Sequence, residues 1–264
     1  MERSTVALVR CDSYDVDEVY AALKRGVDLL GGLDRFVRAG EKILLKPNLL
    51  ASEPPEKAVT THPALLEASV RLLAEVGATC CYGDSPGRET PAHAARGCGM
   101  VAAAERCGIE MADFGSAEPL AVQPVEGVEA QYESSYPIAR AVHATDGLIN
   151  LAKAKSHQLT RLTLAVKNLY GCIPGPRKAL YHVQYQDVHA FSGMLAEMVR
   201  SLPVRLHVLD AVVAMEGNGP RSGDPLHMGL LLLSTDPVAL DATFCRAGSL
   251  SFADSPWQYW PGNP

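Results

Sequence analysis

Basic side chains gather in the segment NLAKAKSHQLTRLTLAVKNLYGCIPG, residues 150–175 of the chain: Lys153, Lys155, His157 and Lys167. An apolar setting lowers the pKa of a lysine ammonium, which makes its amine nucleophilic or basic. Imidazole can move a proton near neutral pH. The alternative is a solvated helix face followed by a surface loop. We favour a functional role for Lys167 because the apolar residues LAV precede it and NLYG closes its segment.

The residues that follow His157 have the spacing of an amphipathic helix. Leucine and valine recur on one helical stripe, which predicts a helix over residues 159–170 that ends at a glycine and a proline. Thr160, Thr163 and Lys167 share a second stripe of this helix. We therefore expect Lys167 to project along a threonine-lined face, with His157 at the helix start.

Polar residues also stand at the ends of predicted strands. A strand over 42–48 ends in Lys46-Pro47-Asn48, a strand over 79–84 runs into the turn GDSPG, and a strand over 206–212 carries Asp210. Ligands of α/β folds gather beyond the carboxyl ends of the strands, so we expect a site for a small anionic substrate there. The residues expected to bind it are Lys46, Asn48, Ser85, Lys153, Lys155, Thr160 and Asn168.

Two carboxylates and a further histidine are candidates for proton transfer and metal binding. Asp84 of GDSPG is expected to act in catalysis as a base beside His157 and Lys167, and a helix-capping turn is the structural alternative. His182 lies in GPRKALYH, predicted to be a polar loop, and His182 with Asp210 could hold a divalent metal. Asp241, in the capped helix STDPVALDA, is expected to be structural.

Several common motifs are absent. The sequence GNGPRSGDP, residues 217–225, lacks the Gly-Lys-Ser/Thr ending of a phosphate loop, and no Gly-x-Gly-x-x-Gly opens a helix after a strand. No His-Glu-x-x-His pair occurs either. The seven cysteines form no Cys-x-x-Cys pair, so an iron-sulfur cluster is not expected.

Short apolar runs alternate with helical patterns along the 264 residues. Strands are expected at 4–10, 42–48, 79–84, 147–153, 206–212 and 230–235. Helices are expected from residue 16 to about Gly31-Gly32 and at 62–78, 91–108, 187–201 and 236–248. This order predicts an α/β fold with a mostly parallel sheet, helices on both faces and the site at the carboxyl ends of the strands. We expect one domain over 1–264, with 109–146 a small excursion and 249–264 an irregular tail.

The bulk properties narrow the partners. A formal charge of -6 argues against general nucleic-acid binding, which requires basic surface. No run reaches 18 apolar residues and the first twenty residues do not resemble a signal peptide, so we expect no membrane span and a cytoplasmic protein with reduced thiols. The sequence leaves the oligomeric state open, a homo-oligomer included.

The motifs LLKPNLL, THP, GDSPG, the 150–175 segment, GPRSGDP and STDPVALDA occur in this order. With them the chain resembles the domain-of-unknown-function family 362 from about residue 40 to residue 245. Many relatives look like iron-sulfur proteins because they carry appended ferredoxin-type cysteine motifs. Since this chain lacks those cysteines, it is not expected to inherit a cluster.

More distantly, the organisation is similar to the N-terminal domain of nickel-pincer lactate racemases. That likeness implies His157 as the acid–base group, Lys167 as the attachment point of a tethered nickel cofactor and His182 as a metal ligand. Asp84 and Ser85 stand where the racemase's other catalytic histidine is expected, so simple lactate racemization is not implied.

Three functional hypotheses follow. The first is an enzyme, racemase-, isomerase- or lyase-like, that moves a proton on a small anionic carbon acid, with or without a metal. The second is a redox enzyme or electron-transfer partner related to the cluster-bearing relatives. The third is a non-catalytic module that binds a small anion.

Overall fold

A computed structural model describes residues 4–123, 132–175 and 177–248, so the irregular tail expected at 249–264 lies outside the described residues. The central sheet has the order β1-β9-β8-β6-β2-β3, and β7 pairs with β6. β3, β2, β6 and β8 run parallel to one another. β9 pairs antiparallel with both β8 and β1, and β7 pairs antiparallel with β6. The predicted mostly parallel α/β sheet is confirmed. The strands are β1 (Val6–Arg10), β2 (Lys42–Pro47), β3 (Thr79–Tyr82), β6 (Gly147–His157), β7 (Arg161–Thr163), β8 (Val204–Glu216) and β9 (Asp224–Ser234).

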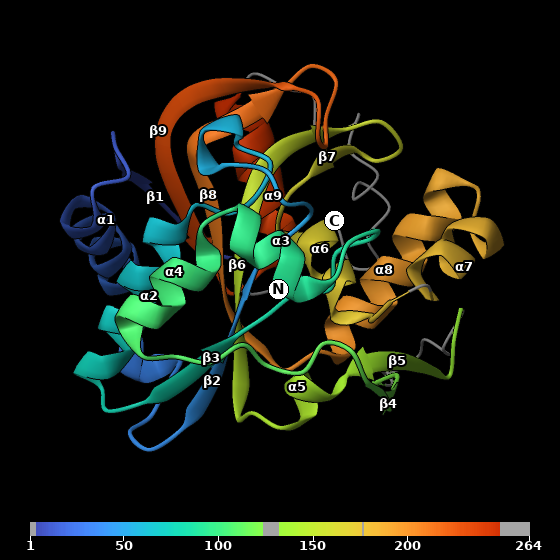
Figure 1. The fold of residues 1–264 in the computed structure, drawn as a ribbon, viewed down its shortest axis with the longest axis horizontal. Coiled ribbons are helices and arrows are strands. Elements are labelled where there is room, and N and C mark those ends of the chain that lie inside the picture. Colours follow the sequence, from blue (N-terminus) through green and yellow to red (C-terminus); the bar gives the residue numbers. More distant parts are fainter. Residues whose placement is uncertain (1–3, 124–131, 176, 249–264) are drawn as a thin grey trace.

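Helices cover both faces of the sheet, because its buried strands carry apolar side chains on both sides (Figure 1). One face packs against α1 (Val16–Leu29), α2 (Pro63–Glu75) and α4 (Met100–Cys107). The other packs against α6 (Ala165–Asn168), α8 (Val188–Ser201) and α9 (Pro237–Ala247). The remaining helices are α3 (Pro91–Gly97), α5 (Arg140–His143), α7 (Arg177–Gln184) and the 3-10 turns Leu33–Arg35, Pro55–Lys57 and Leu169–Cys172.

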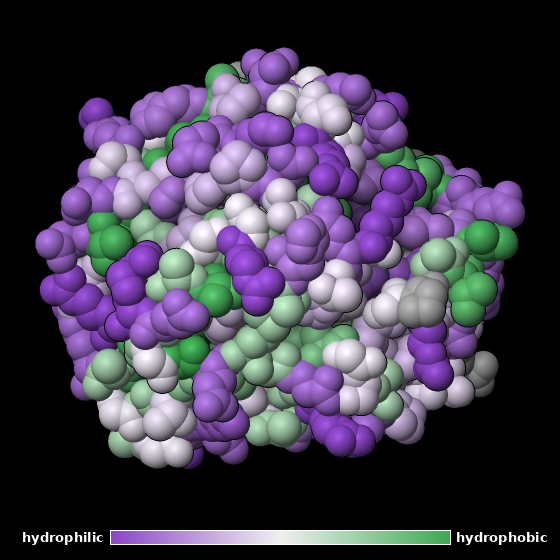
Figure 2. All heavy atoms as spheres, viewed as in Figure 1, coloured by the Kyte–Doolittle hydropathy of each residue, from purple (hydrophilic) through white to green (hydrophobic). Residues whose placement is uncertain are grey.

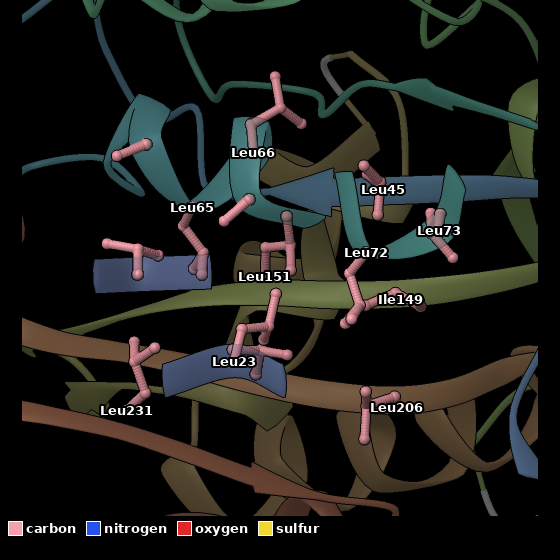
Figure 3. Close-up of a cluster of buried hydrophobic side chains, with 14 of the residues drawn as sticks. Leu23, Leu45, Leu65, Leu66, Leu72, Leu73, Ile149, Leu151, Leu206 and Leu231 are labelled. Carbon is pink, nitrogen blue, oxygen red and sulfur yellow. The ribbon is translucent and has the colours of Figure 1, made fainter. Parts of the chain in front are cut away.

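The core on the first face shows why these sequences form these elements. Figure 3 shows leucines of α2 facing Leu45 of β2 and Ile149 and Leu151 of β6, with Leu23 of α1 nearby. These side chains recur at helical spacing in α2 and at alternate positions in the strands, as one buried face of each element requires. Full burial of each is worth roughly 1.5–3 kcal/mol. The two helices therefore fix the strand ends that carry the polar residues.

Three local predictions were wrong. Residues 159–170 do not form one helix: β6 continues to His157, turns, and pairs with β7 through Lys155–Thr163 and His157–Arg161 before the short α6 begins. The predicted helix over 91–108 is interrupted between α3 and α4, where Gly99 has φ 77°. The predicted polar loop around Lys178 contains α7.

The predicted excursion at 109–146 contains a two-stranded antiparallel sheet of β4 (Ala117–Ala121) and β5 (Ser135–Ala139), followed by α5. The viewed face of the molecule is mostly hydrophilic, with hydrophobic residues exposed at the edge where α7 lies (Figure 2). On α7 these include Leu180 and Val183. Within the described ranges, no helix combines the length and apolarity that crossing a membrane requires.

Candidate functional site

The ends of β2 and β3 meet in a buried ion pair. Nζ of Lys46 lies 2.7 Å from Oδ1 of Asp84, and the two side chains are 0% and 5% exposed. Asp84 also accepts a hydrogen bond from the amide of Leu49 through Oδ2. Gly171 packs directly against the pair, since a Cβ at this position would collide with Oδ1 of Asp84. Glycine at 171 therefore allows the backbone to approach the ion pair closely.

A second buried ion pair joins β6 to β8. Nζ of Lys153 donates to Oδ2 of Asp210 at 3.0 Å and to the hydroxyl of Tyr14 at 2.9 Å. Tyr14 in turn donates to Oδ1 of Asp210, and the amide of His62 donates to Oδ2. The ring of His62 stacks on that of Tyr14. Both oxygens of Asp210 therefore have partners within the protein.

Lys155 begins a chain of buried amides that runs across the sheet. It donates to Oδ1 of Asn48, Asn48 donates to Asn168, and Asn168 donates to Asn150, with distances of 2.8, 2.9 and 2.7 Å. The side-chain amide of Asn150 ends the chain 3.0 Å from Nδ1 of His207. Lys155 has no carboxylate within ion-pair distance among the described residues, and burial together with Lys153 holds its pKa well below the ordinary lysine value. Because every link donates in one direction, the chain fixes the orientation of Asn168 at the end of α6.

The short helix α6 is anchored at its start as well. The carboxylate of Asp241, from α9, accepts the amide protons of Ala165 at 2.8 Å and Val166 at 3.3 Å. Asp241 is fully buried, and burial raises its pKa well above the ordinary aspartate value. Two backbone amides bound to one carboxylate oppose that shift. The residue predicted to be structural thus connects α9 to the helix that carries Lys167.

Among the described residues, the amine of Lys167 lacks a polar partner. Its side chain is 8% exposed, and among the described residues its Nζ has no hydrogen bond and no carboxylate within ion-pair distance. Nζ lies 5.4 Å from the ring centre of Tyr170 and 5.5 Å from that of Phe191. Burial, together with the charge of Lys178, lowers the pKa of Lys167 to about 8. Such an amine is partly deprotonated near neutral pH.

Two histidines flank this amine. Burial and the charge of Lys167 lower the pKa of His157 to about 3 and that of His182 to about 4, so both rings are neutral. Nδ1 of His157 accepts the amides of Leu159 and Thr160 at 3.1 and 3.3 Å. An imidazole that accepts at Nδ1 carries its proton at Nε2. Nε2 of His157 is therefore arranged as a hydrogen-bond donor. The base predicted from the sequence would instead need a free lone pair on Nε2.

Ser85 follows Asp84 and is clamped by Lys178 of α7. Nζ of Lys178 donates to Oγ of Ser85 at 2.7 Å and to the carbonyls of Ser85 and Ile173. The pattern Gly83-Asp84-Ser85-Pro86-Gly87 matches the Gly-x-Ser-x-Gly of hydrolase nucleophiles, a motif that the sequence reasoning missed. Its backbone at Ser85 lacks the positive φ of a strained elbow, and the side chain is buried. These contacts make Ser85 and Lys178 a clamp between the GDSPG turn and α7.

The structure thus pairs the predicted strand-end residues across neighbouring strands, although Lys153 and Asp210 lie inside β6 and β8, and most of these residues have internal partners. Thr160 donates to the carbonyl of Leu162, and its predicted stripe with Lys167 does not exist. Both oxygens of Asp210 accept hydrogen bonds from Lys153, Tyr14 and the amide of His62, which argues against Asp210 as a metal ligand, whereas His182 stays a candidate. Across 4–123, 132–175 and 177–248, no three His, Cys, Asp or Glu side chains group as metal ligands.

Other residues of the region were not singled out from the sequence. Tyr14, His62, Asn150 and Gly171 take part only through contacts between distant segments. Asn150, inside an otherwise apolar strand, is the one that a search for polar residues in buried strands would have found. A hollow of about 640 Å³ lies between α7 and the β4–β5 hairpin, and none of the predicted site residues lines it.

Comparison with known proteins agrees with the sequence motifs. Residues 43–246 match the domain of unknown function DUF362. The chain belongs to this family. A thylakoid-associated protein of Synechocystis sp. is 34% identical over 238 residues, which are 90% of this chain and 72% of that protein. The predicted family membership is confirmed.

Two solved structures share the fold. The lactate racemase apoprotein of Thermoanaerobacterium thermosaccharolyticum has a TM-score of 0.56 at 12% identity and is matched over 90% of this chain. A Thermotoga maritima protein has a TM-score of 0.54 at 12% identity and is matched over 92% of this chain. The chain spans 56% and 61% of the length of these two proteins. The predicted likeness to lactate racemases therefore holds at the level of the fold.

Proposed function

We propose that this protein is an enzyme that moves a proton on a small anionic carbon acid, with Lys167 as the group that exchanges the proton. The observation that carries the proposal is the amine of the largely buried Lys167, which has no hydrogen bond or ion pair among the described residues. The helix that bears it is anchored at both ends by Asp241 and Asn168. A side chain held firmly while its reactive atom is left free is typical of a functional site.

The charge balance supports an anionic substrate. Asp84 and Asp210 pair with Lys46 and Lys153, which leaves Lys155, Lys167 and Lys178 without a carboxylate partner in the described part of the chain. Burying an ammonium without a counterion is costly, and the lowered pKa values express that cost. A bound carboxylate or phosphate would offset it by supplying the missing negative charge.

The neighbouring groups fit proton transfer next to a carboxylate. With a pKa of about 8, roughly a quarter of Lys167 is the free amine at pH 7.5, which is a poised base. The amine would take the proton from the carbon beside the carboxylate and return it. Nε2–H of neutral His157 would donate to the oxygen on which the negative charge develops. In this proposal His157 is the electrophilic group and Asp84 the partner that holds Lys46.

A lysine-tethered cofactor would also fit the described residues in part. Lys167 offers an amine without a partner among the described residues as the attachment point, and His182 offers a neutral imidazole whose pKa is lowered by burial and by the same lysine. When bound, such a group would supply a metal beside the substrate. Intact mass spectrometry of the purified protein would show an adduct, and peptide mapping would locate it.

Deuterium exchange tests the proposal across a range of candidate substrates. A panel of 2-hydroxy, 2-amino and 2-oxo carboxylates is incubated with the protein in D2O, and loss of the Cα proton is followed by NMR. We expect exchange with at least one compound, its loss in Lys167→Met, and no effect of Lys57→Met at an exposed lysine. Undiminished exchange in Lys167→Met would contradict the role of the amine. Binding without exchange would favour the anion-binding module.

A further inference from the structure

The position of Lys167 depends on a very short helix. α6 has four residues, Ala165–Asn168, and too few hydrogen bonds of its own to be stable in isolation. Its first amides would be unsatisfied in a buried setting, because the first turn of a helix has no internal acceptors. A buried unsatisfied amide costs about 1–3 kcal/mol. Some other element must therefore supply acceptors at the start of α6.

Asp241 supplies them from a different helix. Its Oδ1 and Oδ2 accept from Ala165 and Val166, so one carboxylate fills the role of an N-cap from 76 and 75 residues further along the chain. Leu164, the residue in the cap position itself, has no side chain that can do so. α6 and α9 also pack against each other in one apolar cluster, which includes Ala165, Leu240 and Phe244. Asp241 is thus the polar contact within an otherwise apolar interface.

The amine of Lys167 is sensitive to the placement of α6. It lies over the rings of Tyr170 and Phe191, and Phe191 belongs to α8. A shift of α6 away from α8 would let more water reach the ammonium and reduce the desolvation that depresses its basicity. We propose that Asp241 is a positioning residue for Lys167: by holding the first two amides of α6, it keeps the lysine amine over these rings and limits its contact with water. This inference rests on the role of Lys167 in the proposed function.

The chain offers a matched control in the same helix. Asp236 is the N-cap of α9 and also accepts two backbone amides, those of Val238 at 2.8 Å and Ala239 at 3.0 Å. Asparagine is as good an N-cap as aspartate, so Asp236→Asn should be nearly neutral. In Asp241→Asn the amide group has a single acceptor oxygen for two N–H donors, and its NH2 faces one of them. One amide of α6 then loses its acceptor.

The experiment measures the pH dependence of acylation at Lys167 by peptide mass spectrometry in the full-length wild type, Asp241→Asn and Asp236→Asn. In the wild type and Asp236→Asn we expect a midpoint near 8. In Asp241→Asn the midpoint should rise by at least about one pH unit, which lowers labelling at pH 7.5 about eightfold. A purely structural role of Asp241 would lower the unfolding temperature without moving this midpoint. Asp241→Ser, which retains one acceptor, provides a second variant if the first does not fold.

The outcomes separate this inference from the proposed function. Equal midpoints near 8 in the wild type and folded Asp241→Asn would overturn the positioning role alone. A wild-type midpoint near the ordinary lysine value of about 10.4 would overturn the proposed function and this inference together. Failure of both Asp241 variants to fold would assign the residue to the core and overturn the inference, while the proposed function would stand.

Discussion

Replacement of Asp84 by asparagine tests whether the ion pair at the ends of β2 and β3 holds this part of the fold. The carboxylate faces two donors, Nζ of Lys46 and the amide of Leu49. The asparagine side chain has one acceptor oxygen, so its NH2 must face one of these donors. Lys46 is completely buried, and its remaining hydrogen bond goes to the carbonyl of Pro47. Leaving a buried charge without its partner costs about 3–5 kcal/mol.

Urea denaturation followed by circular dichroism at pH 7 measures this loss. For a chain of this size, about 3–5 kcal/mol corresponds to a fall of roughly 6–20 °C in the unfolding temperature. The matched control is Glu75→Gln, which breaks the pair between Glu75 and Lys24 at the surface, where both side chains are more than a third exposed. That change should cost less than about 1 kcal/mol.

Two results would refute the reasoning. If Asp84→Asn were no more destabilising than Glu75→Gln, the pair would not be the buried interaction that its geometry indicates. The double variant Asp84→Asn with Lys46→Met removes the uncompensated ammonium as well, and it should recover part of the loss. A double variant that is less stable than Asp84→Asn alone would mean that Lys46 contributes mainly through packing of its side chain.

Three further predictions concern the lysines without carboxylate partners. The pKa of Lys167 in the folded protein, about 8, lies below the ordinary lysine value of about 10.4. Between these two pH values the unfolded chain binds more protons at this lysine than the folded chain does. The stability contributed by this group therefore rises with pH across that window. At pH 7 Lys167→Met should therefore be more stable than the wild type. This difference should shrink by roughly 1.4 kcal/mol per pH unit across that window. A difference that stays the same in urea denaturation at pH 7, 8, 9 and 10 would contradict this. Lys178→Met leaves the carbonyls of Ser85 and Ile173 without their donor and should cost about 2–3 kcal/mol in the same assay, against about 1 kcal/mol for Ser85→Ala. Binding of phosphate or acetate should be accompanied by proton uptake between pH 7.5 and 8.5, because a bound anion raises the pKa of Lys167. Calorimetry in two buffers of different ionisation enthalpy measures this uptake. An uptake of zero would argue against binding beside this amine.

Much of the fold was predictable because its strongest signals are local. Apolar strands such as LINLA and the amphipathic pattern of α2, with Pro63 in its first turn, identify the alternating elements of a parallel sheet. Their order in turn predicted that Lys46, Asp84, Lys153 and Asp210 would lie at strand ends. Lys46 and Asp84 form an ion pair at the ends of β2 and β3, whereas Lys153 and Asp210 form theirs inside β6 and β8, which extend further than predicted. Burial of apolar faces leaves the strands few other arrangements.

The partners of these residues could not be predicted in the same way. Residues 159–170 have the periodicity of a helix, yet pairing of Lys155 with Thr163 and capping by Asp241 delay the helix to Ala165. No pattern in the sequence connects Lys155 to His207 through three asparagines either. Both results depend on hydrogen bonds between segments distant in the chain, which carry no periodic signature.

By itself the sequence determined the family through its motifs and the α/β architecture through its periodicity, because periodicity reports on burial. Only the tertiary structure decided which of the basic residues are free. Lys46 and Lys153 are neutralised by Asp84 and Asp210, whereas the largely buried Lys167 has an amine without a partner in the described chain. The reason is physical: the reactivity of a lysine is set by desolvation and neighbouring charges, and both arise from side chains that the fold brings together.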